Sequence, residues 1–228
     1  MRLSLLLVGI GAASLGAVAG AFAIHRIDGA KAIRFAIARR IGAIDEQARR
    51  APEGAVLVVG DSIAERSGLT SLCGRAVFNG GVSSATAEDV ADHARGWIAS
   101  LHPSIVIVAL GMNDAKADVP AAPDRFEGAV RAIAATGVPT GLAAITRLED
   151  KPAAAGFSQA RIDALNTRLA AIAAALHAPL APSIAAPTED GVHPTDAGRR
   201  QWRANLERAC PAAPITASGP ASVSRRNI

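Results

Sequence analysis

A serine stands at the end of an apolar run, at a place where a parallel sheet would expose it. Ser62 follows the stretch Val56–Asp61, in which four apolar residues precede a Gly-Asp pair, and a helical pattern begins just after it. This pattern predicts a buried strand followed by a helix, and open α/β sheets bind ligands at the carboxyl ends of such strands. A backbone N–H at a helix N-terminus also favours negative charge. Ser62 is therefore a candidate nucleophile, although Gly-Asp-Ser is also typical of an ordinary turn and helix cap.

A histidine far along the chain has the partner that a catalytic base needs. Among the five histidines of the chain, only His193 follows a carboxylate in an arrangement of this kind, Asp190-Gly-Val-His193-Pro194. The spacing allows the Asp190 carboxylate to reach Nδ1 of the imidazole, which leaves Nε2 facing outward as a base. We interpret Asp190 and His193 as a candidate pair for activating Ser62.

Two further loops of small and polar residues follow predicted strands. The first spans residues 78–86 (Phe-Asn-Gly-Gly-Val-Ser-Ser-Ala-Thr), and its small residues let backbone N–H groups approach a bound group. The second reads Gly111-Met-Asn113-Asp114, and the Asn113 amide is a candidate donor to a developing oxyanion. Each loop considered alone is more typical of a simple turn.

Together the motifs resemble a known family. Gly60-Asp61-Ser62, Gly111-x-Asn113-Asp114 and Asp190-x-x-His193 are similar, in order and spacing, to three sequence blocks of the SGNH (GDSL-type) hydrolases, and the similarity covers residues 55–208. The stretch Gly60–Ala64 also approaches the G-x-S-x-G motif of α/β-hydrolases. In that fold, however, the nucleophile follows a central strand with several strands before it, whereas Ser62 follows the first strand.

The resemblance implies an esterase or lipase that forms an acyl-enzyme and uses no metal or organic cofactor. Ser62 would be the nucleophile, His193 the base and Asp190 its orienting partner, and the oxyanion hole would comprise the N–H groups of Ser62 and Ser84 and the Asn113 amide. Gly81, Gly111 and Asp114 would support the site. The chain departs from the family at Ser84, because alignment on Asn79 places this serine where a glycine usually supplies the N–H. Gly80 and Gly81 are the alternative donors if that alignment is shifted.

The order of predicted elements indicates an α/β fold. Alternating strands and helices predict a parallel sheet with helices on both faces, and the family resemblance implies a flavodoxin-like three-layer α/β/α sandwich of about five parallel strands. We expect the hydrolase domain at 55–210 and a disordered tail, rich in Ala, Pro, Ser and Gly, at 211–228. The strands are expected at 55–59, 76–79, 104–110, 139–145 and 180–183, and the helices at 87–100, 124–136, 159–177 and 195–209.

The N-terminal region predicts contact with a membrane. Residues 3–24 contain no charge, so segment 1–25 is interpreted as a signal peptide or a transmembrane anchor. Segment 26–54 predicts a basic amphipathic helix that lies on the membrane or packs on the domain. Basic residues after the apolar run favour a cytoplasmic domain, whereas an export signal and a disulfide between Cys73 and Cys210 would favour an extracytoplasmic one. We expect the latter.

Composition narrows the range of partners. Of the net charge of +4, residues 1–50 contribute +5 and the remainder −1, so the folded part is nearly neutral. Aromatic residues make up only 3% of the chain, which argues against a stacking surface for nucleic acid. The expected partners are a small-molecule, lipid or glycan ester, and the membrane. Two alternatives remain open: an acyltransferase that uses the same residues, and a membrane-tethered binding module without catalysis.

Overall fold

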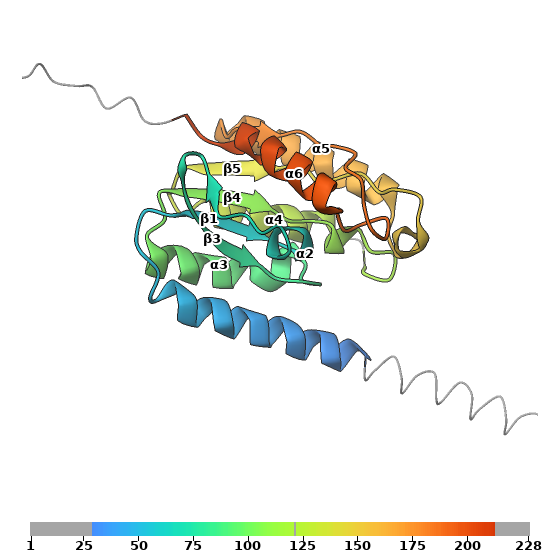
Figure 1. Cartoon of the computed structure of the whole chain (residues 1–228), viewed down its shortest axis with the longest axis horizontal. Coiled ribbons are helices and arrows are strands. Elements are labelled where there is room, and N and C mark those ends of the chain that lie inside the picture. The colour runs from blue at the N-terminus through green and yellow to red at the C-terminus, as the bar shows by residue number, and fades with distance from the viewer. Residues whose placement is uncertain (1–28, 121, 213–228) are drawn as a thin grey trace, which may run out of the picture.

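A six-stranded sheet forms the centre of the computed structural model, which describes residues 29–120 and 122–212 (Figure 1). The strand order is β2-β3-β1-β4-β5-β6, and all neighbours are parallel except β2, which is antiparallel to β3. The strands are β1 (Val56–Gly60), β2 (Ser71–Leu72), β3 (Arg75–Gly81), β4 (Ile105–Ala109), β5 (Thr140–Ala143) and β6 (Leu180–Ala181); the α-helices are α2 (Ser62–Glu65), α3 (Ala87–Leu101), α4 (Pro123–Ala134), α5 (Gln159–Leu176) and α6 (Asp196–Leu206).

The two central strands explain the apolar runs in the sequence. β1 is buried along its whole length, and it pairs with β3 on one side and β4 on the other. A parallel strand covered on both faces needs apolar side chains on both faces, so it has a continuous run in place of an alternating pattern. The sequence therefore identified the centre of the sheet correctly.

Helices cover the sheet on both faces. α3 lies against one face, where Trp97 is 1% exposed and an added Cβ on Gly80 would lie 3.2 Å from its ring. The segment after α6 lies so close to the other face that an added Cβ on Gly141 would lie 1.8 Å from the carbonyl oxygen of Ala209. The three-layer α/β/α arrangement predicted from the sequence is confirmed.

Two details differ from the prediction. The short edge strand β2 was not predicted, and because it is antiparallel the sheet is mixed. The predicted strand at 139–145 ends at Ala143, because the N–H and C=O of Ile145 both bond to the Asn166 side chain of α5 (2.7 and 3.0 Å), and the same C=O also accepts from the Ser183 hydroxyl (2.6 Å). The chain thus leaves the sheet where a side-chain amide replaces a neighbouring strand.

A helix at residues 29–48 precedes the sheet and runs beside α3 (Figure 1). Its second half packs on the domain: Ile41 and Ile44 are buried, and Asp45 accepts a hydrogen bond from the Trp97 indole. Its first half is exposed, with Ile33 at 47% and Phe35 at 71%. The amphipathic pattern of the sequence therefore corresponds, in the second half, to packing on the protein.

Both predicted terminal segments lie largely or wholly outside the described residues. Segment 1–25 lies entirely outside them, as does 213–228 of the predicted tail. Among the residues that the structure describes, no helix combines the length and the apolar character needed to cross a membrane.

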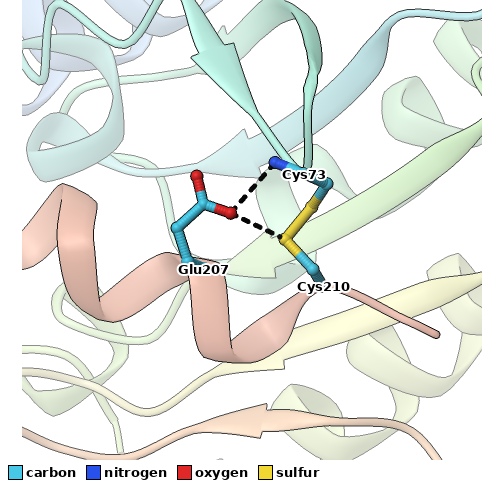
Figure 2. Close-up of a disulfide and its surroundings, with 3 residues drawn as sticks. All are labelled: Cys73, Glu207 and Cys210. Carbon is cyan, nitrogen blue, oxygen red and sulfur yellow. Dashed lines mark hydrogen bonds between the residues drawn. A yellow bond between two sulfur atoms is a disulfide. The ribbon is translucent and has the colours of Figure 1, made fainter.

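A disulfide joins the β2–β3 turn to the end of the folded chain (Figure 2). Cys73 and Cys210 are bonded across a sequence separation of 137, and the Cys73 N–H also donates to Glu207 (3.2 Å). Together with Glu207, these cysteines form the one cluster of three potential metal ligands in the described residues. Since both sulfur atoms are bonded to each other, neither is available as a thiolate ligand.

We predict that replacing both Cys73 and Cys210 with Ala lowers the free energy of unfolding by about 2–5 kcal/mol, because the loop closed by the bond is long. Urea unfolding of the double variant and of the parent, each with and without reductant, measures the change. Reductant should bring the parent to the variant's midpoint and leave the variant unchanged. Equal midpoints for oxidised parent and variant would contradict the prediction.

Candidate active site

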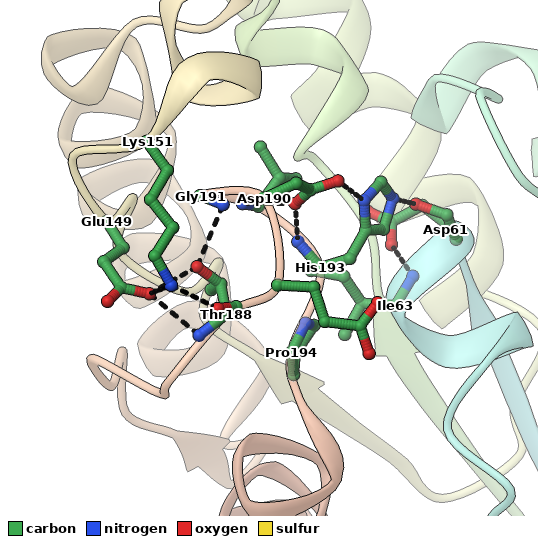
Figure 3. Close-up of polar contacts among 12 residues, drawn as sticks. Asp61, Ile63, Glu149, Lys151, Thr188, Asp190, Gly191, His193 and Pro194 are labelled. Carbon is green, nitrogen blue, oxygen red and sulfur yellow. Dashed lines mark hydrogen bonds and ion pairs between the residues drawn. The ribbon is translucent and has the colours of Figure 1, made fainter.

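Of the three residues predicted to act together, His193 lies within hydrogen-bond reach of both Ser62 and Asp190, and Figure 3 shows its contact with Asp190. Ser62 Oγ lies 3.0 Å from Nε2 of His193, although the two residues are 131 positions apart. His193 Nδ1 lies 2.7 Å from Oδ2 of Asp190. Ser62 follows β1 and His193 precedes α6, so both stand at the edge of the sheet where the parallel strands end. Loops that converge at this edge place a base beside a hydroxyl.

Asp190 is held in its ionised form by the turn that carries it. Burial alone would raise its pKa, but hydrogen bonds from the backbone and imidazole of His193 and from the Val192 N–H together lower the pKa of Asp190 to about 2. Both N–H groups donate to the same oxygen, at 2.8 and 2.9 Å, which leaves the other oxygen for the imidazole. An ionised Asp190 accepts a hydrogen bond from the Nδ1–H of His193 and keeps the proton on Nδ1, so Nε2 is the nitrogen that can accept the Ser62 proton.

A loop after β5 fixes this turn from behind (Figure 3). Glu149 accepts hydrogen bonds from the N–H and hydroxyl of Thr188 and pairs with Lys151 (2.9 Å), and these contacts lower the pKa of Glu149 to about 2. The Thr188 hydroxyl in turn accepts from the Gly191 N–H (2.9 Å). Gly191 has φ +105°, and a Cβ there would lie 2.8 Å from the carbonyl oxygen of Glu149. Glycine is therefore required between Asp190 and His193.

The turn at Ser84 presents a free donor. Ser83 N–H donates to Glu65 (2.7 Å) and Ala85 N–H to Val82 (3.3 Å), whereas Ser84 N–H has no acceptor among the described residues. Ser84 also has φ +65°, a left-handed conformation that favours glycine. The backbone thus keeps the glycine-type conformation that the family resemblance implies at this position, although the residue is a serine. Gly81, the alternative donor, gives its N–H to Asn79 (2.9 Å).

Asn113 lies beside the same turn. It is buried, and its amide nitrogen donates to the carbonyl of Ala85 (2.9 Å), which leaves one amide hydrogen without a partner in the described residues. Gly111 has φ +125°, and a Cβ there would lie 2.5 Å from Ile145, so this glycine permits close packing behind Asn113. The structure therefore places Asn113 beside the turn that carries Ser84, and the N–H of Ser62, the third predicted donor, opens the single-turn helix α2.

The N-terminal helix supports residues 79–86, the segment that carries Ser84 and is called the donor loop below. The sequence did not predict this support. Arg40 donates to the backbone oxygens of Asn79 (3.2 Å) and Gly81 (2.9 Å), and its Nε lies 3.3 Å from Glu65. The second oxygen of Glu65 holds the Ser83 N–H described above. In the sequence Arg40 is one of several basic residues on an amphipathic helix, and nothing there distinguishes it from a solvated charge.

Two buried carboxyl groups flank the site. Burial raises the pKa of Asp61 to about 6, against hydrogen bonds that favour its ionised form, including one from Ile63 N–H (2.9 Å). Burial also raises the pKa of Asp114 to about 6, and the charge of Asp61 adds to the increase. Asp114 accepts the Ala87 N–H (3.1 Å) at the start of α3, next to the loop that carries Ser84. This contact is consistent with the supporting role predicted for Asp114.

The sequence of this region identifies the family. Residues 58–201, well over half of the chain, match the model of the GDSL-like lipase/acylhydrolase family. The chain belongs to this family, and it is an ester-bond hydrolase. No curated protein matches the sequence significantly.

Solved structures share the fold. A Streptococcus pneumonia protein described as a platelet activating factor is 19% identical with a TM-score of 0.65, covering 78% of this chain and 96% of its own. A GDSL-like lipase from Bacteroides thetaiotaomicron is 23% identical (TM-score 0.57; 68% and 86% covered). An acetylxylan esterase from Geobacillus stearothermophilus is 19% identical (TM-score 0.57; 70% and 94% covered). These similarities show the α/β fold.

We predict that Asp114→Asn becomes progressively more stable than the parent as pH rises from about 4 to about 6. A buried carboxyl with a raised pKa holds its proton in the folded state after the unfolded state has lost it, so the parent loses stability across this window. The relative gain should be on the order of 1–3 kcal/mol. Thermal unfolding at several pH values measures it. Asp92→Asn, whose side chain is 94% exposed, is the control, and an Asp114→Asn offset that does not change with pH would contradict the prediction.

Proposed function

We propose that the protein hydrolyses carboxylic esters through an acyl-enzyme formed on Ser62. The observation that carries the proposal is the continuous hydrogen-bonded chain from Ser62 Oγ through His193 to Asp190, at 3.0 and 2.7 Å. An ionised carboxylate at one end and a hydroxyl at the other are the arrangement that activates a serine.

In the first step Ser62 Oγ attacks the ester carbonyl carbon and its proton passes to Nε2 of His193. The negative charge that develops on the carbonyl oxygen is stabilised by the N–H groups of Ser62 and Ser84 and by the Asn113 amide, each of which has a hydrogen without an acceptor among the residues that the structure describes. The intermediate then collapses, the alcohol leaves with the proton from His193, and the acyl group remains on Ser62. Water repeats the sequence with His193 as base and releases the carboxylic acid.

Two alternatives use the same fold. A non-catalytic binding module would leave Ser62 and His193 beyond hydrogen-bond reach, and the 3.0 Å separation argues against it. An acyltransferase would pass the acyl group to an alcohol other than water, with the same residues. Product analysis in the presence of added alcohols separates transfer from hydrolysis.

The disulfide supports an extracytoplasmic location for the domain, because bonds of this kind persist in oxidising compartments. The uncharged stretch 3–24 would then serve as its export signal or as its anchor. Thiol trapping on protein isolated from each cellular fraction tests this part of the proposal, and reduced cysteines would oppose it.

We predict that Ser62→Ala and His193→Ala each lower kcat/KM for p-nitrophenyl acetate by about 10⁴-fold or more. The double variant should lose no more than either single variant, because the two residues act in one step. Labelling of the parent by a fluorophosphonate, absent in Ser62→Ala, reports the nucleophile directly. Ester turnover that survives Ser62→Ala would reject the proposed mechanism.

We predict that Ser84 acts through its backbone. Ser84→Gly and Ser84→Ala keep the N–H and should lose much less activity than Asn113→Ala, for which a loss of roughly 10²–10³-fold in kcat is expected. Ser84→Gly should also be more stable than Ser84→Ala, because only alanine keeps a Cβ at φ +65°. If both Ser84 variants fall as far as Asn113→Ala, the hydroxyl is the donor and the assignment to the N–H is wrong.

A further inference from the structure

A cavity of about 530 Å³ reaches Ser84, one of the proposed oxyanion donors. Ser84 and Asp114 line it at one end, and the rest of its wall comes from the helix at 29–48, the start of α3, the loop after β4, α4 and α5. Its volume is within the range of pockets that hold small-molecule ligands, roughly 300–1,000 Å³. The cavity is therefore large enough for part of a substrate whose carbonyl lies at Ser84.

Apolar side chains form much of the wall. They come from separate elements: Ile33 and Ile37 from the N-terminal helix, Val119 from the loop after β4, Phe126 from α4 and Leu165 from α5. Phe126 and Leu165 are 1% and 6% exposed, so they contribute a buried, fixed floor. An apolar ligand resting on this floor would remove water from Ile33 and Ile37, which are exposed and half-buried.

Several charged side chains of the wall are already engaged with the protein. Arg125 pairs with Glu88 (3.2 Å), Arg161 donates to the carbonyl of Val119 (2.8 Å), and Asp114 caps α3. A ligand rich in hydroxyl groups needs a free partner for each buried group, since burial without one is costly. Arg34 and Asp118 also line the cavity but are exposed, so their charges can stay in water, and Lys116 lies over the Phe157 ring (5.9 Å). The apolar part of the wall is thus better suited to a hydrocarbon chain than to a sugar.

One wall of the cavity is outside the part of the chain that matches the family. The family match begins at residue 58, whereas Ile33 and Ile37 belong to the helix at 29–48. The first turns of that helix lie toward the edge of the sheet where the strands end (Figure 1). Arg40, one turn further along, holds the donor loop, so the helix is fixed relative to the site.

We propose that this cavity binds the acyl chain of the ester and that the helix at 29–48 sets the preferred chain length. The proposal rests on the proposed function, because it takes Ser84 as the end at which the carbonyl lies. It identifies the substrate class as esters of medium-length or longer fatty acids. Ile33 and Ile37 are assigned as specificity-determining residues.

The experiment compares kcat/KM of the full chain for p-nitrophenyl esters from acetyl to dodecanoyl. Each added methylene should raise kcat/KM by about threefold to fourfold until the cavity is filled. Ile37→Gln and the more exposed Ile33→Gln should each lower the ratio of octanoyl to acetyl kcat/KM by about tenfold. Phe35→Gln is the matched control, because Phe35 is 71% exposed on the same helix and does not line the cavity.

Three results would overturn the inference: a preference for acetyl esters, a chain-length profile that the Ile variants leave unchanged, or an equal effect of Phe35→Gln. The last result would indicate that the exposed helix surface contacts ester aggregates. Binding of the fluorescent fatty acid cis-parinarate to Ser62→Ala gives a readout without turnover, and Ile37→Gln in that background should weaken it about tenfold. If no ester is hydrolysed but this binding is found, the cavity assignment stands and the proposed function fails.

Discussion

The contact between Ser62 and His193 depends on two loops that are 131 residues apart in the chain and meet at one edge of the sheet. Neither loop could hold its side chain alone, because Ser62 opens a helix of a single turn and His193 lies in an irregular segment. The parallel sheet supplies the common edge, since the strands before Ser62 and before the donor turns all end there. Packing of β1 between β3 and β4 is thus the constraint on which the site depends.

Polar contacts complete the arrangement from two opposite sides. Behind His193, the Glu149–Thr188 contacts fix the turn that carries Asp190. Behind Ser84, Arg40 and Glu65 fix the loop that carries the donors. Neither support touches the reacting hydroxyl, but each limits the freedom of a group that must be in place before reaction. Such preorganisation is the means by which fixed donors stabilise a transition state without rearrangement.

The sequence predicted the parts of the structure that follow from periodicity and from short motifs. The apolar run before Ser62 predicted a buried strand, because a strand covered on both faces needs apolar side chains at successive positions. Asp190 and His193 were found because they lie three positions apart in the chain, and Ser84 because the family resemblance was aligned on Asn79. The support from Glu149 and Arg40 was not predicted, since a charge on a loop or helix has the same appearance whether it meets water or a distant backbone oxygen. The short β2 strand lacks any periodic signal at two residues.

The helix at 29–48 joins the fold to the chemistry. Burial of Ile41 and Ile44 attaches the helix to the domain. Arg40 is adjacent to Ile41 and donates to the donor loop. Ile37 and Ile33 continue the same apolar stripe and line the cavity, and Ile37 also packs against the core. One apolar stripe with helical spacing therefore packs on the domain at its C-terminal end and lines the cavity at its N-terminal end. The periodicity of a sequence shows that one face of a helix is apolar. Only the structure shows which residues of that face pack in the core and which line a cavity.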